Sequence, residues 1–116
     1  MNSRIEADQA RATLSASVTS YVLGCAVSDI LAERRGRPDA AFARQVAMYI
    51  THTSFGLSLA RVAIAFGRDR STVAHACHLI EDRRDDLNFD LWLEELADLI
   101  QGLGRLSTPS ETALAS

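Results

Sequence analysis

The residues that follow Gly67 include side chains able to pair with phosphates and with the edges of bases. If this stretch is helical, one face carries residues that are short or form hydrogen bonds: Arg70, Ser71, Ala74, His75 and His78. Arginine pairs with phosphate and guanine, and the first turns of a recognition helix enter the major groove of DNA. The pattern therefore indicates a surface for double-stranded DNA. The alternative is a helical hairpin with a solvated polar face.

Apolar residues on either side of Gly67 predict the two helices that would position this surface. They repeat at helical spacing in two short sets: Leu59, Val62, Ala63 and Phe66, then Val73, Ala76, Cys77 and Ile80. Two short amphipathic helices joined by a tight turn with a glycine are typical of a helix-turn-helix, here at residues 59–84.

The rest of the pattern predicts an all-α chain of about six helices. Besides those at 59–66 and 70–84, the expected helices cover residues 10–24, 29 to 34 or 35, 40–53 and 88–103. The expected N-caps of the second to fifth helices are Ser28, Asp39, Ser58 and Asp69. The first helix should bury Leu14, Val18, Tyr21, Val22 and Cys25, and the last Phe89, Trp92, Leu93, Leu96, Leu99, Ile100 and Leu103. We expect one domain at 10–103, between a flexible segment at 1–9 and a disordered tail at 104–116.

The chain of 116 residues carries a formal net charge of −3, but its charges are distributed unevenly. From Arg34 to Arg84 nine arginines accompany four acids, whereas from Asp85 to the end one arginine accompanies seven acids. A basic middle between acidic ends predicts a localised anion-binding surface. The chain has no lysine, and arginine suits bidentate contacts to guanine and phosphate, although genomic base composition produces the same bias.

The composition fits one soluble domain. Apolar residues make up 47% and charged residues 23%. No apolar run approaches the ~20 residues of a membrane span, and the amino terminus lacks the apolar core of a secretory signal. We therefore expect a cytoplasmic, nucleoid-associated protein. Cys25 and Cys77 lie among apolar neighbours and are expected to be buried thiols in a reducing compartment.

The reactive side chains do not predict catalysis or a cofactor. His75, Cys77 and His78 suggest a metal site, but on a helix Cys77 points to the core while both histidines face outward, which is poor geometry for one tetrahedral site. A Cys–His nucleophile fails for the same reason, and no acidic residue would orient the base. We expect no enzymatic activity and no cofactor.

Two stretches carry a resemblance to a known family. ARQVAMYI (residues 43–50) and GLSLARVAIAFGRDRSTVAHACHLIE (residues 56–81) resemble the C-terminal DNA-binding domain of the bacterial replication initiator DnaA. That family has a basic loop, an Arg-Gln helix start and a signature close to GGRDHTTV-HAC-KIE. The similarity covers about Ser28 to Leu99 and implies a Trp-repressor-like helical bundle that binds DNA.

The resemblance also implies a map of DNA contacts. In the next helix the matched positions are Arg44, Gln45 and, in place of a phosphate-binding lysine, His52. In the basic loop Arg35 is matched, and its neighbours Arg34 and Arg37 are expected contacts as well. Arg35 matches the arginine that enters the minor groove, while Arg44 and Gln45 match a pair that contacts bases and phosphates. The signature residues expected to face the major groove are Arg68, Asp69, Arg70, Ser71, Thr72 and His75.

Departures from the family pattern change the expected target. One glycine of the pair before Arg68 is missing, Ala43 replaces a proline, and Arg70 and Ser71 stand where the family has histidine and threonine. The initiator's origin box is therefore not the expected site. These 116 residues contain no GxxxxGK[ST] loop and no lysine to form one, so we do not expect the initiator's ATPase domain. We therefore expect a protein that is not an initiator in the full sense.

These features predict a standalone, sequence-specific DNA-binding protein that regulates transcription. Within that class, one interpretation is an activator of phage-derived or gene-transfer-agent genes, as in relatives that carry a DnaA-like domain alone. The alternatives are a replication modulator that competes for initiator sites and a protein-interaction module that has lost DNA binding. The acidic C-terminal helix should face away from DNA, toward solvent or a partner such as RNA polymerase or another regulator. Its acids are Asp90, Glu94, Glu95 and Asp98.

Overall fold

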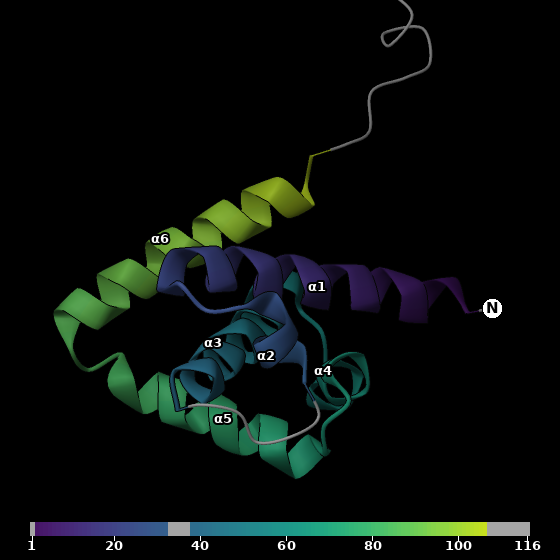
Figure 1. The fold of residues 1–116 in the computed structure, drawn as a ribbon, viewed down its shortest axis with the longest axis horizontal. Helices are drawn as coiled ribbons and strands as arrows, with labels where there is room; N and C mark the ends of the chain where they lie inside the picture. The colour runs from purple at the N-terminus through teal and green to yellow at the C-terminus, as the bar shows by residue number, and fades with distance from the viewer. Residues whose placement is uncertain (1, 33–37, 107–116) are drawn as a thin grey trace, which may run out of the picture.

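Six helices make up the part of the chain that the computed structural model describes, residues 2–32 and 38–106, and this part contains no strand (Figure 1). They are α1 (Ser3–Leu23), α2 (Val27–Leu31), α3 (Pro38–Phe55), α4 (Leu59–Phe66), α5 (Arg70–Arg83) and α6 (Leu87–Gly104). The predicted all-α class is confirmed. None of these helices combines the length and the hydropathy that crossing a bilayer requires. The expected loop contacts Arg34, Arg35 and Arg37 and most of the expected tail lie outside the described residues.

The central helix of the bundle is α3. Its residues 46–51 are all buried, because α1, α4, α5 and α6 pack around it. Ala47 and Met48 belong to an apolar cluster shared with α1, α4 and α5, whereas Tyr49 and Ile50 belong to a second cluster formed mainly with α6. In Figure 1, α1 and α6 run along one side of the molecule and α5 runs along the opposite side. The apolar sequence of α3 therefore joins the helix-turn-helix and the C-terminal helix into one body.

The first helix differs from its prediction in both its start and its buried face. It begins at Ser3 rather than Ala10, because the Asn2 side chain caps it by accepting a hydrogen bond from the Arg4 amide in the first turn. The buried face consists of small and polar residues: Asp8, Ala12, Ser15, Ala16, Thr19 and Ser20. The predicted apolar stripe is wrong at Tyr21, which is 88% exposed, and at Val22. Small side chains allow the helix axes of α1 and α3 to approach closely, and this favours the small face for packing.

One ion pair joins the start of α1 to α4. The Arg61 guanidinium donates from Nε to Asp8 Oδ2 at 2.8 Å and from Nη2 to Asp8 Oδ1 at 2.7 Å, and Asp8 is buried. The hydrogen bond from Arg61 is the main cause that holds the pKa of Asp8 below its ordinary 3.8. Asp8 thus fixes the first helix against the first helix of the helix-turn-helix.

Three more elements begin or pack differently from expectation. The α3 helix begins at Pro38, so Asp39, the predicted N-cap, lies within its first turn. Ala26, not Ser28, stands at the N-cap of α2, so that helix begins earlier than predicted. In α6 the buried residues are Leu93, Leu96 and Ile100, while Leu99 and Leu103, predicted to be buried, are exposed. The reason is that α6 packs with one narrow face against α1 and α3 and leaves the neighbouring positions uncovered.

Candidate nucleic-acid interface

The helix-turn-helix predicted at residues 59–84 is present as α4 and α5. The Ser58 side chain caps α4, as expected. The helix ends at Phe66 and is followed by Gly67, whose φ of 64° is a left-handed conformation that glycine adopts without strain. The Arg68 amide then donates to the Ala63 carbonyl at 2.9 Å and closes the turn. This geometry fixes the direction in which α5 leaves the turn.

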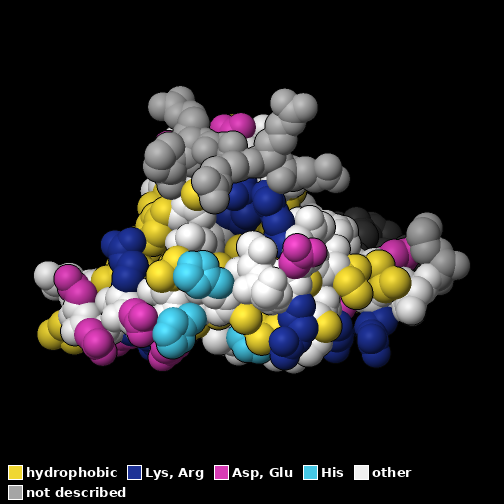
Figure 2. Space-filling model, turned by 90° about the horizontal axis from the view of Figure 1, so that it is seen from below, with side chains coloured by type: hydrophobic (Ala, Val, Ile, Leu, Met, Phe, Trp, Pro, Cys, Tyr) yellow, Lys and Arg dark blue, Asp and Glu magenta, His cyan; other side chains and the backbone are white. Residues whose placement is uncertain are grey.

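One face of α5 is buried and the other is presented to solvent. Val73, Ala76 and Ile80 are buried, as their spacing predicts. The side chains at the exposed start of the helix form no hydrogen bond or ion pair within the described residues: Arg70, Ser71, Thr72 and His75. Figure 2 shows this side of the molecule, with arginine and histidine side chains over its middle and acidic side chains gathered at the end where α5 leads into α6. A guanidinium, two hydroxyls and an imidazole are therefore available to a ligand.

Asp69 occupies the N-cap position of α5 but does not cap the helix with its side chain. Its backbone is extended, with φ −72° and ψ 148°, and its carboxylate accepts no hydrogen bond from the first turn. The predicted position is right and the predicted capping bond is wrong. The carboxylate is exposed beside Arg70 instead, where it is available as a hydrogen-bond acceptor.

Arg44 and Arg68 fasten α2 to the rest of the bundle. Arg44 is only 6% exposed, and its Nε and Nη2 donate at 2.7 Å to the carbonyls of Ile30 and Asp29. Arg68 Nη2 donates to the Ala32 carbonyl. Burial and, to a smaller degree, the neighbouring charge of Arg68 lower the pKa of Arg44 from its ordinary value, although an arginine stays charged in a protein. The two guanidiniums satisfy the carbonyl end of α2, a role that the sequence did not predict.

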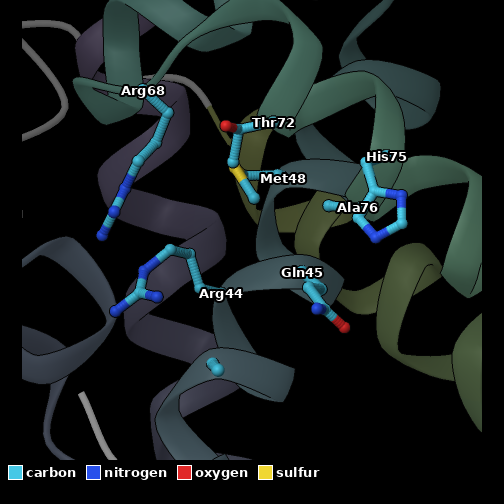
Figure 3. A pocket seen from close by; sticks show the side chains of 8 residues that line it. Arg44, Gln45, Met48, Arg68, Thr72, His75 and Ala76 are labelled. Atoms are coloured by element: carbon cyan, nitrogen blue, oxygen red, sulfur yellow. The ribbon is translucent and has the colours of Figure 1, made fainter. Parts of the chain in front are cut away.

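A cavity of about 320 Å³ opens between α3 and α5. Figure 3 shows Arg44 and Arg68 toward one end of this cavity and Gln45 and His75 toward the other. Gln45 is half-buried on α3 and His75 is exposed on α5, so an amide and an imidazole from two helices reach the same opening. Thr72 and Met48 also line it. At this cavity α3 extends the polar surface of α5.

His52 lies apart from this group, in the last turn of α3. It is half-buried, and its Nδ1 lies 2.6 Å from the Leu57 carbonyl oxygen. This hydrogen bond orients the imidazole and holds the connection between α3 and α4. A phosphate contact from His52 stays a prediction.

Two arginines at the C-terminal end of α5 contact other helices. The Arg83 guanidinium carbon lies 4.5 Å from the centroid of the Phe42 ring and 4.6 Å from that of Phe89. An arginine over an aromatic face is attracted by the ring quadrupole. Arg83 thus covers apolar rings of α3 and α6.

Arg84 is the centre of a polar network that joins α3, α5 and α6. Its Nε donates to Asp90 at 2.5 Å, its Nη1 donates to Tyr49 Oη at 2.9 Å, and its Nη2 donates to Glu94. Tyr49 Oη in turn donates to Glu81. Burial, followed by Glu81, raises the pKa of Tyr49 above its ordinary 10.0, and the bonds to Tyr49 and Asp90 raise the pKa of Arg84. Sequence reasoning missed this network. The one signal for it was the pair of acids four residues apart at the start of α6.

The two cysteines are reduced in the structure. Cys77 is half-buried against both apolar clusters, and burial raises the pKa of its thiol to about 11, so the thiol is protonated at neutral pH. Residues 2–32 and 38–106 contain no group of three or more His, Cys, Asp or Glu side chains that could hold a metal ion.

Comparison with known proteins identifies the same segments. A family profile described as the bacterial DnaA protein helix-turn-helix matches residues 16–80. A chromosomal replication initiator protein DnaA from Thermodesulfovibrio yellowstonii is 38% identical over 64 residues, which are 54% of this chain and 14% of that protein. The crystal structure of a DNA replication initiation factor superimposes on 84% of this chain and 30% of the other, with a TM-score of 0.75 and 24% sequence identity. The likeness confirms the fold.

Proposed function

The chain belongs to the family of bacterial DnaA helix-turn-helix domains, and from this premise we propose that it is a sequence-specific double-stranded-DNA-binding protein that regulates transcription. The family match supports DNA binding. The observation that carries the proposal is the exposed start of α5, where four polar side chains without partners in the described residues project from a helix-turn-helix: Arg70, Ser71, Thr72 and His75.

We assign base recognition to this start of α5. Arg70 offers a guanidinium fork that fits the O6/N7 edge of guanine, and Asp69 offers an acceptor for the cytosine amino group. Gln45 and His75 lie at one cavity, so the α3 amide can contact the same duplex as α5. The preferred site should therefore contain a guanine opposite Arg70.

We assign affinity rather than base recognition to the remaining contacts. Arg34, Arg35 and Arg37 would supply phosphate contacts, with Arg35 in the minor groove. Arg44 and Arg68 also donate to the carbonyl end of α2, and they would approach a phosphate at one end of the cavity. Each phosphate contact adds to the salt dependence of binding without specifying sequence.

The regulatory role has two candidate forms. The first candidate is control of transcription, for example activation of phage-derived or gene-transfer-agent genes. In that role RNA polymerase or another regulator would bind the acidic α6. The second candidate is a replication modulator that occupies initiator sites. The 38% identity to a replication initiator protein supports this candidate. In either form the protein would act at the nucleoid in the cytoplasm.

Selection of bound fragments from genomic DNA, followed by titration of the selected duplex at several salt concentrations, tests the proposal. We expect one enriched motif and a linear fall of log affinity with log salt concentration. Arg70→His with Ser71→Thr should shift the motif toward the initiator box with the salt slope unchanged. Arg105→Ala, which removes the same charge from the exposed end of α6, is the matched control. Equal binding of every fragment, or none, would contradict the proposal, and an unshifted motif would remove base recognition from these two positions.

A further inference from the structure

An apolar groove runs along α6, and the last residue of α5, Arg83, is the one α5 residue that lines it. Two hollows meet at Trp92. One of about 170 Å³ is lined by Val22, Trp92, Glu95, Leu96 and Leu99. The other, of about 300 Å³, is lined by Leu23, Phe42, Arg83, Asn88, Phe89 and Trp92. We refer to the two hollows together as the Trp92 groove.

The walls of the Trp92 groove are fixed, while its rim is open. The Phe42 and Phe89 rings lie 6.2 Å apart, and the Phe89 and Trp92 rings lie 5.7 Å apart, so aromatic packing between α3 and α6 forms one wall. On the rim, Leu99 is 51% exposed and Val22 is 42% exposed. Contiguous exposed apolar surface of this kind marks an interaction site more often than scattered single residues do.

The groove has the length of a short helix. Asn88 and Leu99, which line its two ends, lie 11 positions apart on α6. At about 1.5 Å per residue these positions are separated by about 16 Å, which is three turns of an α-helix. A helix of this length places four apolar side chains, at i, i+3, i+4 and i+7, along one groove.

The charges around the groove select the partner. The α6 helix contains four acids and no arginine or lysine between Leu87 and Gly104, and residues 12–23 of α1 carry no charge. Asp90 and Glu94 are paired with Arg84. Glu95, which lines the groove, and Asp98, which lies three positions further along α6 beside the hollow that contains Arg84, have no ion pair within the described residues. The cation that lines the groove, Arg83, covers the Phe42 and Phe89 rings in the other hollow. A second copy of the chain docked through the same face would bring these acids together, which is unfavourable.

We propose that the Trp92 groove binds an amphipathic helix of another protein, with apolar residues in the groove and lysine or arginine residues beside Glu95 and Asp98. In Figure 1 α6 and α5 occupy opposite sides of the bundle, so the partner helix and DNA bind at the same time. The proposal does not depend on DNA binding, because none of the α5 residues assigned to DNA lines the groove.

The single tryptophan of the sequence reports on the groove directly. The probe is a synthetic helical peptide without tryptophan, with leucines at i, i+3, i+4 and i+7 and lysines beside them. We expect it to change the emission of Trp92 in a saturable manner, with weaker binding at high salt. The same peptide with glutamate in place of lysine should bind at least tenfold more weakly.

Variants of exposed residues separate the groove from the rest of the surface. Leu99→Ser should weaken peptide binding at least fivefold, and Glu95→Gln with Asp98→Asn should remove the preference for the lysine peptide. Leu87→Ser is the matched control, since Leu87 is 68% exposed and does not line the groove. Circular dichroism verifies that each variant is folded.

Three results would overturn the proposal. The first is unchanged Trp92 emission with the lysine peptide. The second is equal affinity for the lysine and glutamate peptides. The third is a wild-type dimer in sedimentation equilibrium that Leu99→Ser, but not Leu87→Ser, dissociates, because that result assigns the groove to a second copy. Loss of DNA binding alone would contradict the function proposed above and leave this inference intact.

Discussion

Both ends of α5 carry arginine, but the arginine at its start is exposed and those at its end contact other helices. At its start Arg70 is exposed and has no partner within the described residues. At its end Arg83 covers two aromatic rings, and Arg84 bonds to Tyr49, Asp90 and Glu94. The first end can bind a ligand without losing an internal contact, whereas the second end maintains the packing of α6.

This difference shows that a sequence segment rich in arginine does not necessarily form a basic surface, because internal contacts can engage most of its guanidiniums. Of the nine arginines between residues 34 and 84, three lie outside the described residues. Five of the other six bond to carbonyls or acids or cover aromatic rings: Arg44, Arg61, Arg68, Arg83 and Arg84. Among the described arginines of this segment, Arg70 alone is exposed with a guanidinium that neither forms a hydrogen bond nor covers an aromatic ring.

The largest effect on stability should come from Arg44, an expected DNA contact that also holds α2 through buried hydrogen bonds. Arg44→Ala leaves the carbonyls of Ile30 and Asp29 without their donors and opens a void, so we expect a loss of about 3 kcal/mol in the free energy of unfolding. Urea denaturation measures this loss. Gln45→Ala, on the adjacent and less buried position, should cost less than ~1 kcal/mol. Wild-type stability of Arg44→Ala would mean that the buried bonds do not hold α2.

Arg70→Ala should weaken DNA binding without lowering the stability of the fold. We expect affinity for the selected duplex to fall by about 2 kcal/mol, because a bidentate contact to guanine is lost, with an unchanged melting temperature. Fluorescence anisotropy measures the affinity, and thermal denaturation of the same sample measures the melting temperature. An equal loss of affinity on random duplex would show that Arg70 contacts phosphate rather than a base.

Arg84→Met sharpens the comparison at the other end of α5. The side chain keeps its apolar length but loses the bonds to Tyr49, Asp90 and Glu94, so we expect about 1 kcal/mol less stability, since the network is partly exposed. Affinity for the selected duplex should not change. If DNA binding weakens at a temperature where the variant is fully folded, the two ends of α5 are not independent.

The smallest effect on stability should come from Asp69→Ala. Because the carboxylate forms no capping bond, we expect a change below about 0.5 kcal/mol, less than the usual loss on removing a capping side chain. Base preference at one position of the site should relax. Binding-site selection on this variant measures the second effect, and a large fall in melting temperature would show that the carboxylate caps α5 after all.

The sequence predicted the elements of the site better than the roles of its residues. The bounds of α4 and the start of α5 agree with the expectation, because apolar spacing, the cap at Ser58 and Gly67 are local signals. The buried face of α1 was wrong, since hydrophobicity favoured Tyr21 while close packing on α3 selects small residues. The partners of Arg44 and Arg84 lie on other helices, and only the tertiary structure brings them together.

The bond between Asp8 and Arg61 has a consequence for the kinetics of folding. It joins residues 53 positions apart, whereas the turn between α4 and α5 is closed by neighbours in the sequence. Closing a long loop costs more chain entropy than closing a short one, so we expect α4 and α5 to associate before α1 docks. Contacts absent from the transition state slow unfolding and leave the folding rate unchanged. The Asp8–Arg61 pair would then determine how long a folded molecule lasts before it opens.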